Sequence, residues 1–311
     1  MNIVPIVYAF DNNLMLPACV CIFSLMSNAK EDTFYDIFIL HSAKEDLEHD
    51  QLDTLISFYP NCKIQSLEVD DVFDKAFEVR GITTAAYYRL LIPELIPEYD
   101  KIIYSDVDVI FREDLSDFYL NTELDNYYLA GVNSLAYMVP SYARYYKKIG
   151  LDAKTIIYSG NLLFNSIAIR KAGLVNEFKR LARNSYLFQD MDIINIACKG
   201  HIKYVAPHFC LSTIIQWAIY TNVNLSEHWK KEEIEDALQK GIIHYNGQKP
   251  WQGYCLNFDI WWEYYRKFPF FNEKFYFDFF YAKLNELDQL SFWKRIKILI
   301  RYFVYGKKKL M

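Results

Sequence analysis

Residues 101–110 read KIIYSDVDVI, an apolar run that ends in two aspartates, Asp106 and Asp108. The run 101–105 is rich in β-branched and aromatic residues and predicts a buried strand. Two carboxylates that stand two residues apart are expected to project to the same side of an extended chain. Mg²⁺ and Mn²⁺ prefer such hard oxygen ligands and usually bridge them to the phosphates of a substrate. The stretch therefore predicts a strand that delivers a metal-binding pair, the alternative being an ordinary solvated turn.

The segments on either side of this stretch alternate between strand-like and helix-like patterns. We expect strands at residues 3–9, 36–41, 63–69, 101–105 and 158–169, and helices at 14–28, 43–58, 84–91, 189–199 and 232–240. This alternation is typical of an α/β fold in which helices flank a mostly parallel sheet. Ligands of such sheets bind beyond the carboxyl ends of the strands, so Asp11 and Asp106 are expected to face one crevice.

The composition is that of a globular chain. Of the 311 residues, 52% are hydrophobic and 18% aromatic, and the net charge of −5 argues against a nucleic-acid partner. The six cysteines form no C-x-x-C pair, which favours buried reduced thiols and a cytoplasmic protein. Asp11 interrupts the apolar start, and no uncharged stretch is long enough to span a membrane.

The last 21 residues are strongly basic, with seven Lys or Arg and no acidic residue. Four apolar residues recur there at helical spacing, namely Phe292, Ile296, Leu299 and Phe303. Basic residues fall on the opposite side and in the segment that follows, at Lys294, Lys297, Arg301, Lys307, Lys308 and Lys309. This pattern predicts an amphipathic helix that lies on an anionic membrane surface. The alternative is a C-terminal helix that packs on the body of the protein.

A second candidate motif reads GIIHYNGQKPW at residues 241–251. His244 could supply a nitrogen ligand to a metal, and Lys249 a cation for phosphate, with backbone N–H groups of the loop between them. The alternative is a turn that carries an ordinary surface histidine.

Four motifs in this order resemble glycosyltransferase family 8: VYAFDNN at 7–13, YYRL at 87–90 with YSDVDV following, QDMDIIN at 189–195, and HYNGQKPW at 244–251. The resemblance is strongest to bacterial lipopolysaccharide and lipooligosaccharide galactosyl- or glucosyltransferases, and it covers about residues 3–251. It implies a Rossmann-like nucleotide-diphospho-sugar (GT-A) fold over residues 1–255. Residues 256–311 would then form an aromatic-rich C-terminal region that ends in the basic, membrane-associating helix.

The same resemblance implies a retaining transferase that moves a hexose, galactose or glucose, from a UDP-sugar to a glycan or lipid-linked acceptor of the cell surface. Mn²⁺ (or Mg²⁺) would be held by Asp106, Asp108 and His244. Such an enzyme would work in the cytoplasm, as a peripheral protein on the inner face of the cytoplasmic membrane. The basic C-terminal helix agrees with that location.

Further site residues follow from the matched motifs. The uracil and ribose would contact Ala9, Asp11, Asn13 and the backbone of Val107. The diphosphate would be covered by the loop of Gly247 and Lys249.

The sugar end of the donor would contact Arg89 and Asp190, which are the expected catalytic residues. A guanidinium suits phosphate oxygens, and an ionised carboxylate accepts hydrogen bonds from sugar hydroxyls.

The sequence departs from the family pattern at two positions near the donor sugar. Met191 stands where relatives carry a glutamine, and it offers neither an amide nor a nucleophile of comparable character. Tyr158 stands where they carry an asparagine, and the loop before Lys249 is one residue shorter. A front-side displacement assisted by the leaving group is therefore the expected mechanism. A catalytically silent nucleotide-sugar-binding or scaffold protein of the same fold is the alternative.

Overall fold

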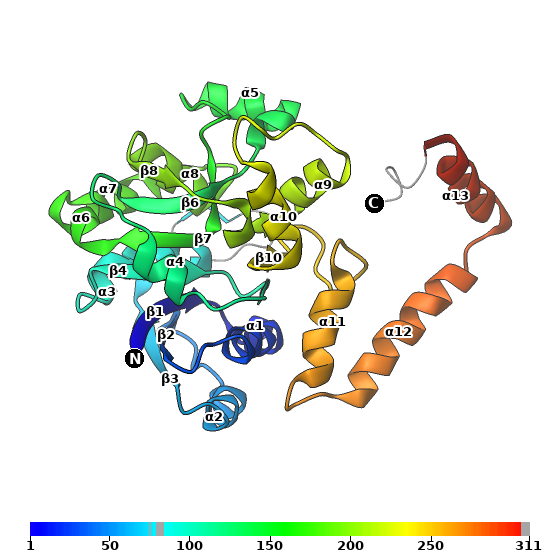
Figure 1. Ribbon diagram of the computed structural model, residues 1–311, viewed down its shortest axis with the longest axis horizontal. Coiled ribbons are helices and arrows are strands. Elements are labelled where there is room, and N and C mark those ends of the chain that lie inside the picture. The colour runs from blue at the N-terminus through cyan, green and yellow to red at the C-terminus, as the bar shows by residue number, and fades with distance from the viewer. Residues whose placement is uncertain (75, 79–83, 306–311) are drawn as a thin grey trace.

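A seven-stranded mixed sheet runs through the computed structural model, which describes residues 1–74, 76–78 and 84–305. Its strand order is β3-β2-β1-β4-β7-β6-β8 (Figure 1). The strands are β1 (Asn2–Ala9), β2 (Thr33–Ser42), β3 (Cys62–Val69), β4 (Lys101–Ser105), β6 (Leu129–Asn133), β7 (Ile157–Asn165) and β8 (Ile202–Tyr204). The first four are parallel, and β7 runs antiparallel to both β4 and β6.

A smaller sheet in the described residues combines β5 (Val109–Phe111), β10 (Ile242–His244) and β9 (Leu211–Ser212), in that order. Strand β10 pairs antiparallel with β5 and parallel with β9. Because β5 directly follows the β4–Asp108 stretch, this sheet joins the DVD motif to segments more than 100 residues later in the chain.

Helices cover both faces of the large sheet (Figure 1). The α-helices are α1 (Met15–Ser27), α2 (Asp50–Ser57), α3 (Ile92–Leu95), α4 (Ser116–Asn121), α5 (Pro140–Lys148), α6 (Ser166–Lys171), α7 (Leu174–Leu181), α8 (Gln189–Ala197), α9 (Thr213–Tyr220), α10 (Lys231–Gln239), α11 (Phe258–Lys267), α12 (Glu273–Asp288) and α13 (Phe292–Tyr305). Short 3₁₀ helices are η1 (Asn12–Leu14), η2 (Asp71–Phe73), η3 (Thr84–Leu91), η4 (Ala136–Met138) and η5 (Pro207–Phe209).

The alternating side chains of β1 explain how one sheet supports two cores. Val4, Ile6 and Tyr8 are buried against α1, whereas Val7 is buried in a second cluster with η3 and α8. Side chains of successive strand residues point to opposite faces, so a strand covered on both sides reads as a continuous apolar run. The predicted α/β architecture with a mostly parallel mixed sheet is confirmed.

Several predicted elements require correction. The helix expected at 43–58 is present only as α2, and residues 43–49 form a loop. The strand expected at 158–169 ends at Asn165, whose side chain accepts a hydrogen bond from the Ala168 N–H and so begins α6. The short helix at 84–91 is a 3₁₀ helix.

Helix α11 is part of the main hydrophobic core. Trp261, Trp262 and Tyr265 are at most 1% exposed, and Phe23 of α1 meets Phe268 with ring centroids 5.7 Å apart. Within the aromatic-rich C-terminal region, α11 and α12 are separated by a short non-helical segment, residues 268–272. The division of the chain at residue 255 stays a prediction.

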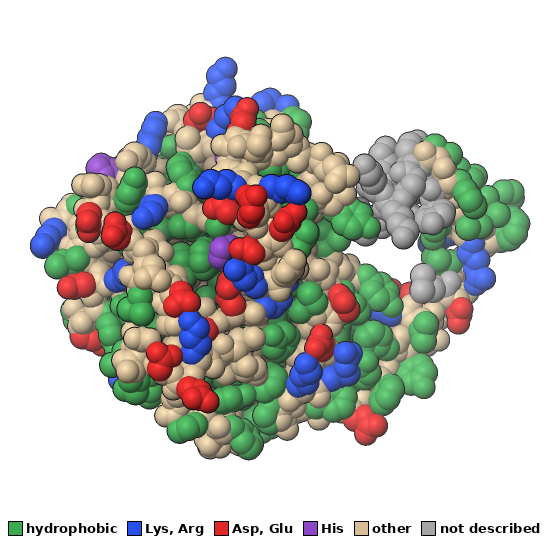
Figure 2. All heavy atoms as spheres, viewed as in Figure 1, with side chains coloured by type: hydrophobic (Ala, Val, Ile, Leu, Met, Phe, Trp, Pro, Cys, Tyr) green, Lys and Arg blue, Asp and Glu red, His purple; other side chains and the backbone are tan. Residues whose placement is uncertain are grey.

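Helices α12 and α13 form an arm (Figure 1): α12 packs against α11, where the rings of Trp262 and Phe279 have centroids 4.7 Å apart, and α13 projects from the body. The predicted C-terminal helix is present as α13, and its apolar side chains are exposed: Phe292 by 67%, Trp293 by 77% and Phe303 by 80%. Hydrophobic side chains cover the outer end of the arm in Figure 2. The predicted basic run Lys307–Lys309 lies outside the described residues. Among the helices that the structure describes, none is both long and apolar enough to cross a bilayer.

Candidate functional site

A pocket of about 720 Å³ opens beyond the carboxyl ends of β1 and β4. The residues predicted for the site all line it: Ala9, Asp11, Asn13, Arg89, Asp106, Val107, Asp108, Asp190, His244, Gly247 and Lys249. They come from five separate segments of the chain, so the fold brings the predicted set together. Their individual roles stay predictions.

Strand pairing fixes the position of the two aspartates. Asp106 follows β4, and its N–H donates to the carbonyl of Gly160 on the neighbouring strand β7 at 2.7 Å. Asp108 precedes β5, and its carbonyl accepts from the Tyr245 N–H at 2.9 Å. His244 ends β10 and stands opposite Val109 in the β5–β10 ladder. Backbone hydrogen bonds therefore hold all three side chains on one side of the junction between the sheets.

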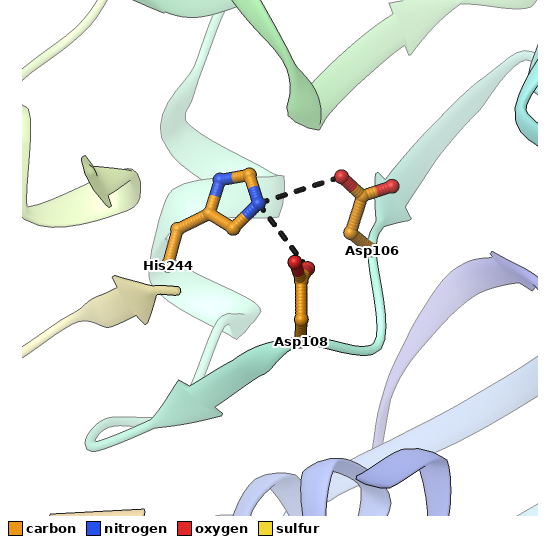
Figure 3. Close-up of side chains that lie close together, drawn as sticks. All are labelled: Asp106, Asp108 and His244. Carbon is orange, nitrogen blue, oxygen red and sulfur yellow. Dashed lines mark ion pairs between the residues drawn. The ribbon is translucent and has the colours of Figure 1, made fainter. Parts of the chain in front are cut away.

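The imidazole of His244 points between the two carboxylates (Figure 3). Its Nε2 atom lies 3.5 Å from Asp106 Oδ2 and 3.2 Å from Asp108 Oδ1. One candidate ligand atom from each residue lies within 4.8 Å of the others. Two carboxylate oxygens and one imidazole nitrogen form a donor set that suits Mn²⁺ or Mg²⁺.

Two further observations fit a divalent ion at this cluster. Asp108 Oδ1 is buried and faces His244 Nε2 at 3.2 Å without a hydrogen bond of good geometry, as expected of two ligands that face a common cation. A Cβ at Gly160 would lie 2.5 Å from Asp106 Oδ2 and 3.0 Å from His244 Nδ1, so only glycine leaves that space free. The three residues could therefore hold a metal ion.

Arg89 contacts both Asp106 and Asp190. Its guanidinium donates to Asp106 Oδ1 at 2.9 Å and to the Ser159 carbonyl at 2.7 Å, and its Nε lies 3.3 Å from Asp190 Oδ2. Burial would lower the pKa of Arg89, but the carboxylates of Asp106 and Asp190 raise it above its ordinary value. Arg89 is therefore a fixed, permanently charged group in the wall of the pocket.

Lys249 provides the second cation. Its ammonium pairs with Asp108 Oδ2 and donates to the Tyr245 carbonyl at 2.8 Å. Burial would raise the pKa of Asp108, but Lys249 and His244 lower it. Burial would also lower the pKa of His244, which the carboxylates of Asp108 and Asp106 raise well above its ordinary value. Arg89 and Lys249 thus favour the ionised form of Asp106 and Asp108, which is the form that can ligate a cation.

Asp190 sits in the first turn of α8, after a residue in an unusual conformation. Gln189 has a φ of +48°, which non-glycine residues adopt rarely and at some energetic cost. Its side-chain amide donates to the Phe77 carbonyl at 2.9 Å. Burial raises the pKa of Asp190 above its ordinary value, although Arg89 opposes the shift. This carboxylate therefore faces the pocket with part of its hydrogen-bonding capacity unused.

The opposite end of the pocket is formed by the turn after β1. The Asp11 carboxylate accepts from the Asn13 N–H at 3.0 Å, which closes the turn into η1. Ala9 ends β1, and the buried Val107 separates the two aspartates of the DVD motif. These residues line the pocket, and their contact with a uracil and a ribose stays a prediction.

The two departures from the family pattern, Met191 and Tyr158, also line the pocket. The sequence reasoning missed Gly160 and Cys210, which touch the candidate metal ligands. A glycine inside a strand indicates that another group approaches the backbone closely, so Gly160 could have been predicted from its place in the expected strand 158–169. No local signal marks Cys210, because its neighbours come from distant segments.

The mixed sheet flanked by helices matches the GT-A fold of glycosyltransferases of known structure. The structure superposes on the galactosyltransferase LgtC, solved with donor and acceptor sugar analogues, with a TM-score of 0.69 and 22% identity, over 87% of this chain and 98% of LgtC. The Glycosyl transferase family 8 model matches residues 5–255, so the chain belongs to that family.

Two other similar proteins are longer than this chain. A protein of Haemophilus influenzae that is named as a glycosyltransferase is 29% identical over 214 residues, which are 66% of this chain and 62% of the relative. The apo structure of the bifunctional glycosyltransferase WbbM superposes with a TM-score of 0.72 and 21% identity, over 88% of this chain and 51% of WbbM. The chain thus matches about three fifths of the Haemophilus protein and about half of WbbM. At their low identity the solved structures bear on the fold alone.

Proposed function

We propose that the protein transfers a hexose, galactose or glucose, from a UDP-sugar to a glycan or lipid-linked acceptor, with retention at the anomeric carbon and with Mn²⁺ or Mg²⁺. The observation that carries the proposal is the convergence of Asp106, Asp108 and His244 beside a glycine that keeps their common space free. Membership of family 8 supports glycosyl transfer. The donor, the metal and the stereochemistry belong to the proposal.

A bound divalent ion would supply positive charge to the departing diphosphate. Lys249 and Arg89 would add two cations that the fold already holds at the pocket wall. Charge that is positioned before the reaction stabilises a developing anion without reorganisation at the moment of bond breaking. Asp190 would accept hydrogen bonds from donor-sugar hydroxyls and so orient the anomeric carbon.

Met191 supports a front-side displacement. Its thioether lines the pocket directly after Asp190 and supplies no carboxylate or amide for a covalent sugar intermediate. In the displacement we propose, the acceptor oxygen bonds to the anomeric carbon on the face from which the phosphate oxygen departs. The acceptor hydroxyl gives its proton to that phosphate oxygen. The atoms of the donor and acceptor therefore balance without a protein nucleophile.

A donor screen tests the proposal. Purified full-length protein with Mn²⁺ and a panel of UDP-sugars should release UDP from one donor, by slow hydrolysis or by transfer. Asp106→Ala and Asp108→Ala should abolish that release, whereas Asp117→Ala, whose side chain is 73% exposed on the surface, should leave it unchanged. Turnover by the two pocket variants near the wild-type rate would discard the metal assignment.

Met191 is also the observation that supports a second candidate function, that of a catalytically silent nucleotide-sugar-binding or scaffold protein. Calorimetry separates the two. Tight, Mn²⁺-dependent binding of UDP with no transfer and no hydrolysis of any donor would favour the silent protein. Release of UDP at a measurable rate would exclude it.

We further propose that the α12–α13 arm places the protein on the cytoplasmic face of an anionic membrane, close to a lipid-linked acceptor. The support is the exposure of Phe292, Trp293 and Phe303 on a helix that also carries exposed Lys294 and Lys297. Aromatic and apolar side chains enter the lipid headgroup region while lysines contact anionic headgroups.

A further inference from the structure

His244 has two ring nitrogens, and the structure gives each a different neighbour. Nε2 faces the carboxylates of Asp106 and Asp108, whereas Nδ1 lies 3.4 Å from the sulfur of Cys210. A neutral imidazole can ligate a metal only through the nitrogen that carries no proton, and the partner of the other nitrogen decides which one that is. We propose that Cys210 is a positioning residue for the metal site, since its sulfur accepts a hydrogen bond from Nδ1–H, which keeps the proton on Nδ1 and leaves the Nε2 lone pair for the cation.

The backbone around Cys210 fixes its sulfur beside His244. Cys210 directly follows η5 and directly precedes β9, and β9 pairs with β10 in a register that sets Ser212 opposite His244. Cys210 is 0% exposed, so water does not compete for the imidazole proton. The contact therefore depends on strand register and not on a surface side chain that could rotate away.

Asn161 holds the sulfur from the other side. Its side-chain amide donates to Cys210 Sγ at 3.6 Å, and its Oδ1 lies 2.8 Å from the hydroxyl of Ser105. Asn161 and Ser105 stand opposite each other in the β7–β4 ladder, next to Asp106. Buried side chains therefore connect Ser105, next to Asp106, through Asn161 and Cys210 to His244. This connection couples the orientation of the His244 ring to the position of Asp106.

The chemistry of sulfur suits this position. A thiol accepts hydrogen bonds weakly, so it fixes the tautomer and the orientation of the ring while raising the basicity of Nε2 only slightly. Partners of metal-ligating histidines typically contribute about 10- to 100-fold in metal affinity, and a weak acceptor belongs at the lower end of that range. We therefore expect an effect of about tenfold on Mn²⁺ affinity.

This inference rests on the proposed metal site, and calorimetric titration of the full-length protein with Mn²⁺ alone separates the two. Cys210→Ala should weaken Mn²⁺ binding about tenfold, whereas Cys210→Ser keeps a hydrogen-bonding oxygen and should stay within about threefold of the wild type. The control is Cys198→Ala, which removes a thiol that is equally buried but lies in the other hydrophobic cluster, and which should bind Mn²⁺ normally. Thermal unfolding monitors the folding of each variant.

Two outcomes would overturn the role of Cys210, and a third would reject the proposed function on which it rests. Wild-type affinity in Cys210→Ala would overturn the role of Cys210, and so would a loss in Cys210→Ser as large as that in Cys210→Ala, because packing alone would then explain both. If Cys210→Ala does not fold, Cys210→Val replaces it, since valine fills the space of the sulfur but accepts no hydrogen bond. Failure of the wild-type protein itself to bind Mn²⁺ would reject the proposed function instead.

Discussion

At the scale of single residues, Gly160 has a clear steric role at the candidate metal site. Because it has no Cβ, no side-chain atom of its own enters the space between Asp106 and His244. Gly160→Ala should fold, because no positive φ is required there, yet its methyl group would crowd both ligands. We expect Mn²⁺ affinity to fall by more than about tenfold, or about 1.4 kcal/mol, in a calorimetric titration.

Gly253→Ala is the matched control for this substitution. A Cβ at Gly253 would meet only the flexible side chain of Gln248, at 3.1 Å, and should leave Mn²⁺ affinity unchanged. An unaltered affinity in Gly160→Ala would mean that the ion binds elsewhere.

Asp192 makes stability depend on pH. It is fully buried, its Oδ2 accepts from the Tyr145 hydroxyl and the Phe188 N–H, and burial raises its pKa from 3.8 to about 6. Because the pKa is higher in the folded state, the protonated carboxyl stabilises folding below about pH 4, and this contribution is lost as pH rises through 6. Asp192→Asn should therefore gain stability over the wild type between pH 4 and 7.

The expected gain is on the order of 2–3 kcal/mol in the free energy of unfolding, measured in urea at both pH values. The amide that Asp192→Asn introduces is never charged, and its oxygen can accept the same two hydrogen bonds. Asp125→Asn, at an exposed position, should show no such pH-dependent difference. Parallel pH profiles for wild type and Asp192→Asn would contradict the assigned role of burial.

Local sequence was sufficient for part of the site. The DVD motif ends a strand with a clear pattern, so Asp106 and Asp108 could be placed from residues 101–110 alone. His244 lies 136 positions after Asp108, and its proximity depends on the β5–β10 pairing, which only the family resemblance indicated. Cys210 could not be found, since both of its contacts cross between distant strands.

At the scale of elements, the loop 43–49 shows why a predicted helix failed. Asn12 donates to Glu45 Oε1 and to the Asp46 carbonyl, and its own Oδ1 accepts from the Glu48 N–H. These bonds replace the helical hydrogen bonds that residues 43–49 would otherwise make. A local pattern cannot reveal a partner 33 or more residues away, so the helix begins only at Asp50.

Helix α11 supports the loop that carries Lys249. Trp262 Nε1 donates to the Pro250 carbonyl at 3.1 Å, and Trp251 contacts Trp261 with ring centroids 5.3 Å apart. The Tyr245 hydroxyl donates to the Asn257 carbonyl at 2.8 Å, just before α11 begins. The residues after 255 thus help to position a pocket whose lining residues all precede them.

Trp262→Ala should therefore destabilise the protein by about 3–5 kcal/mol, because it leaves a cavity among buried aromatic rings. Trp293→Ala is the matched control: Trp293 is 77% exposed on α13, and its removal should change stability by less than about 0.5 kcal/mol. Thermal or urea unfolding measures both. Equal effects of the two substitutions would mean that α11 does not pack on the body in solution.

At the scale of the whole molecule, a metal ion should bind only the folded state. His244 lies far from Asp106 and Asp108 in sequence, and the unfolded chain does not bring its imidazole to the two carboxylates. Mn²⁺ at 100 times its dissociation constant would stabilise the fold by about 2.7 kcal/mol and raise the melting temperature by roughly 5 °C. Asp106→Ala should melt at the same temperature with and without Mn²⁺. A shift of equal size in this variant would place the stabilising ion elsewhere.

The α12–α13 arm gives a test of membrane binding. Truncation after Leu290 removes α13 and all seven basic residues of the last 21, but leaves α11 in the core. The truncated protein should lose binding to vesicles with about 30% anionic lipid (roughly 1 kcal/mol per basic residue near the surface) and should still hydrolyse the donor. Wild-type binding should weaken as salt increases. Vesicle binding that is unaffected by the truncation would exclude α13 as the membrane contact.

The candidate ligands are divided between two sheets, Asp106 at the end of β4 and Asp108 and His244 at the ends of β5 and β10. The binding of a metal ion by these residues would therefore depend on the distance between the two sheets, including changes in that distance that leave the rest of the pocket unaltered. If the three residues hold a metal ion, a compound that separated the two sheets would weaken its binding without occupying the pocket. Such a compound need carry no phosphate, which would spare it the permeability problem that charged nucleotide mimics face.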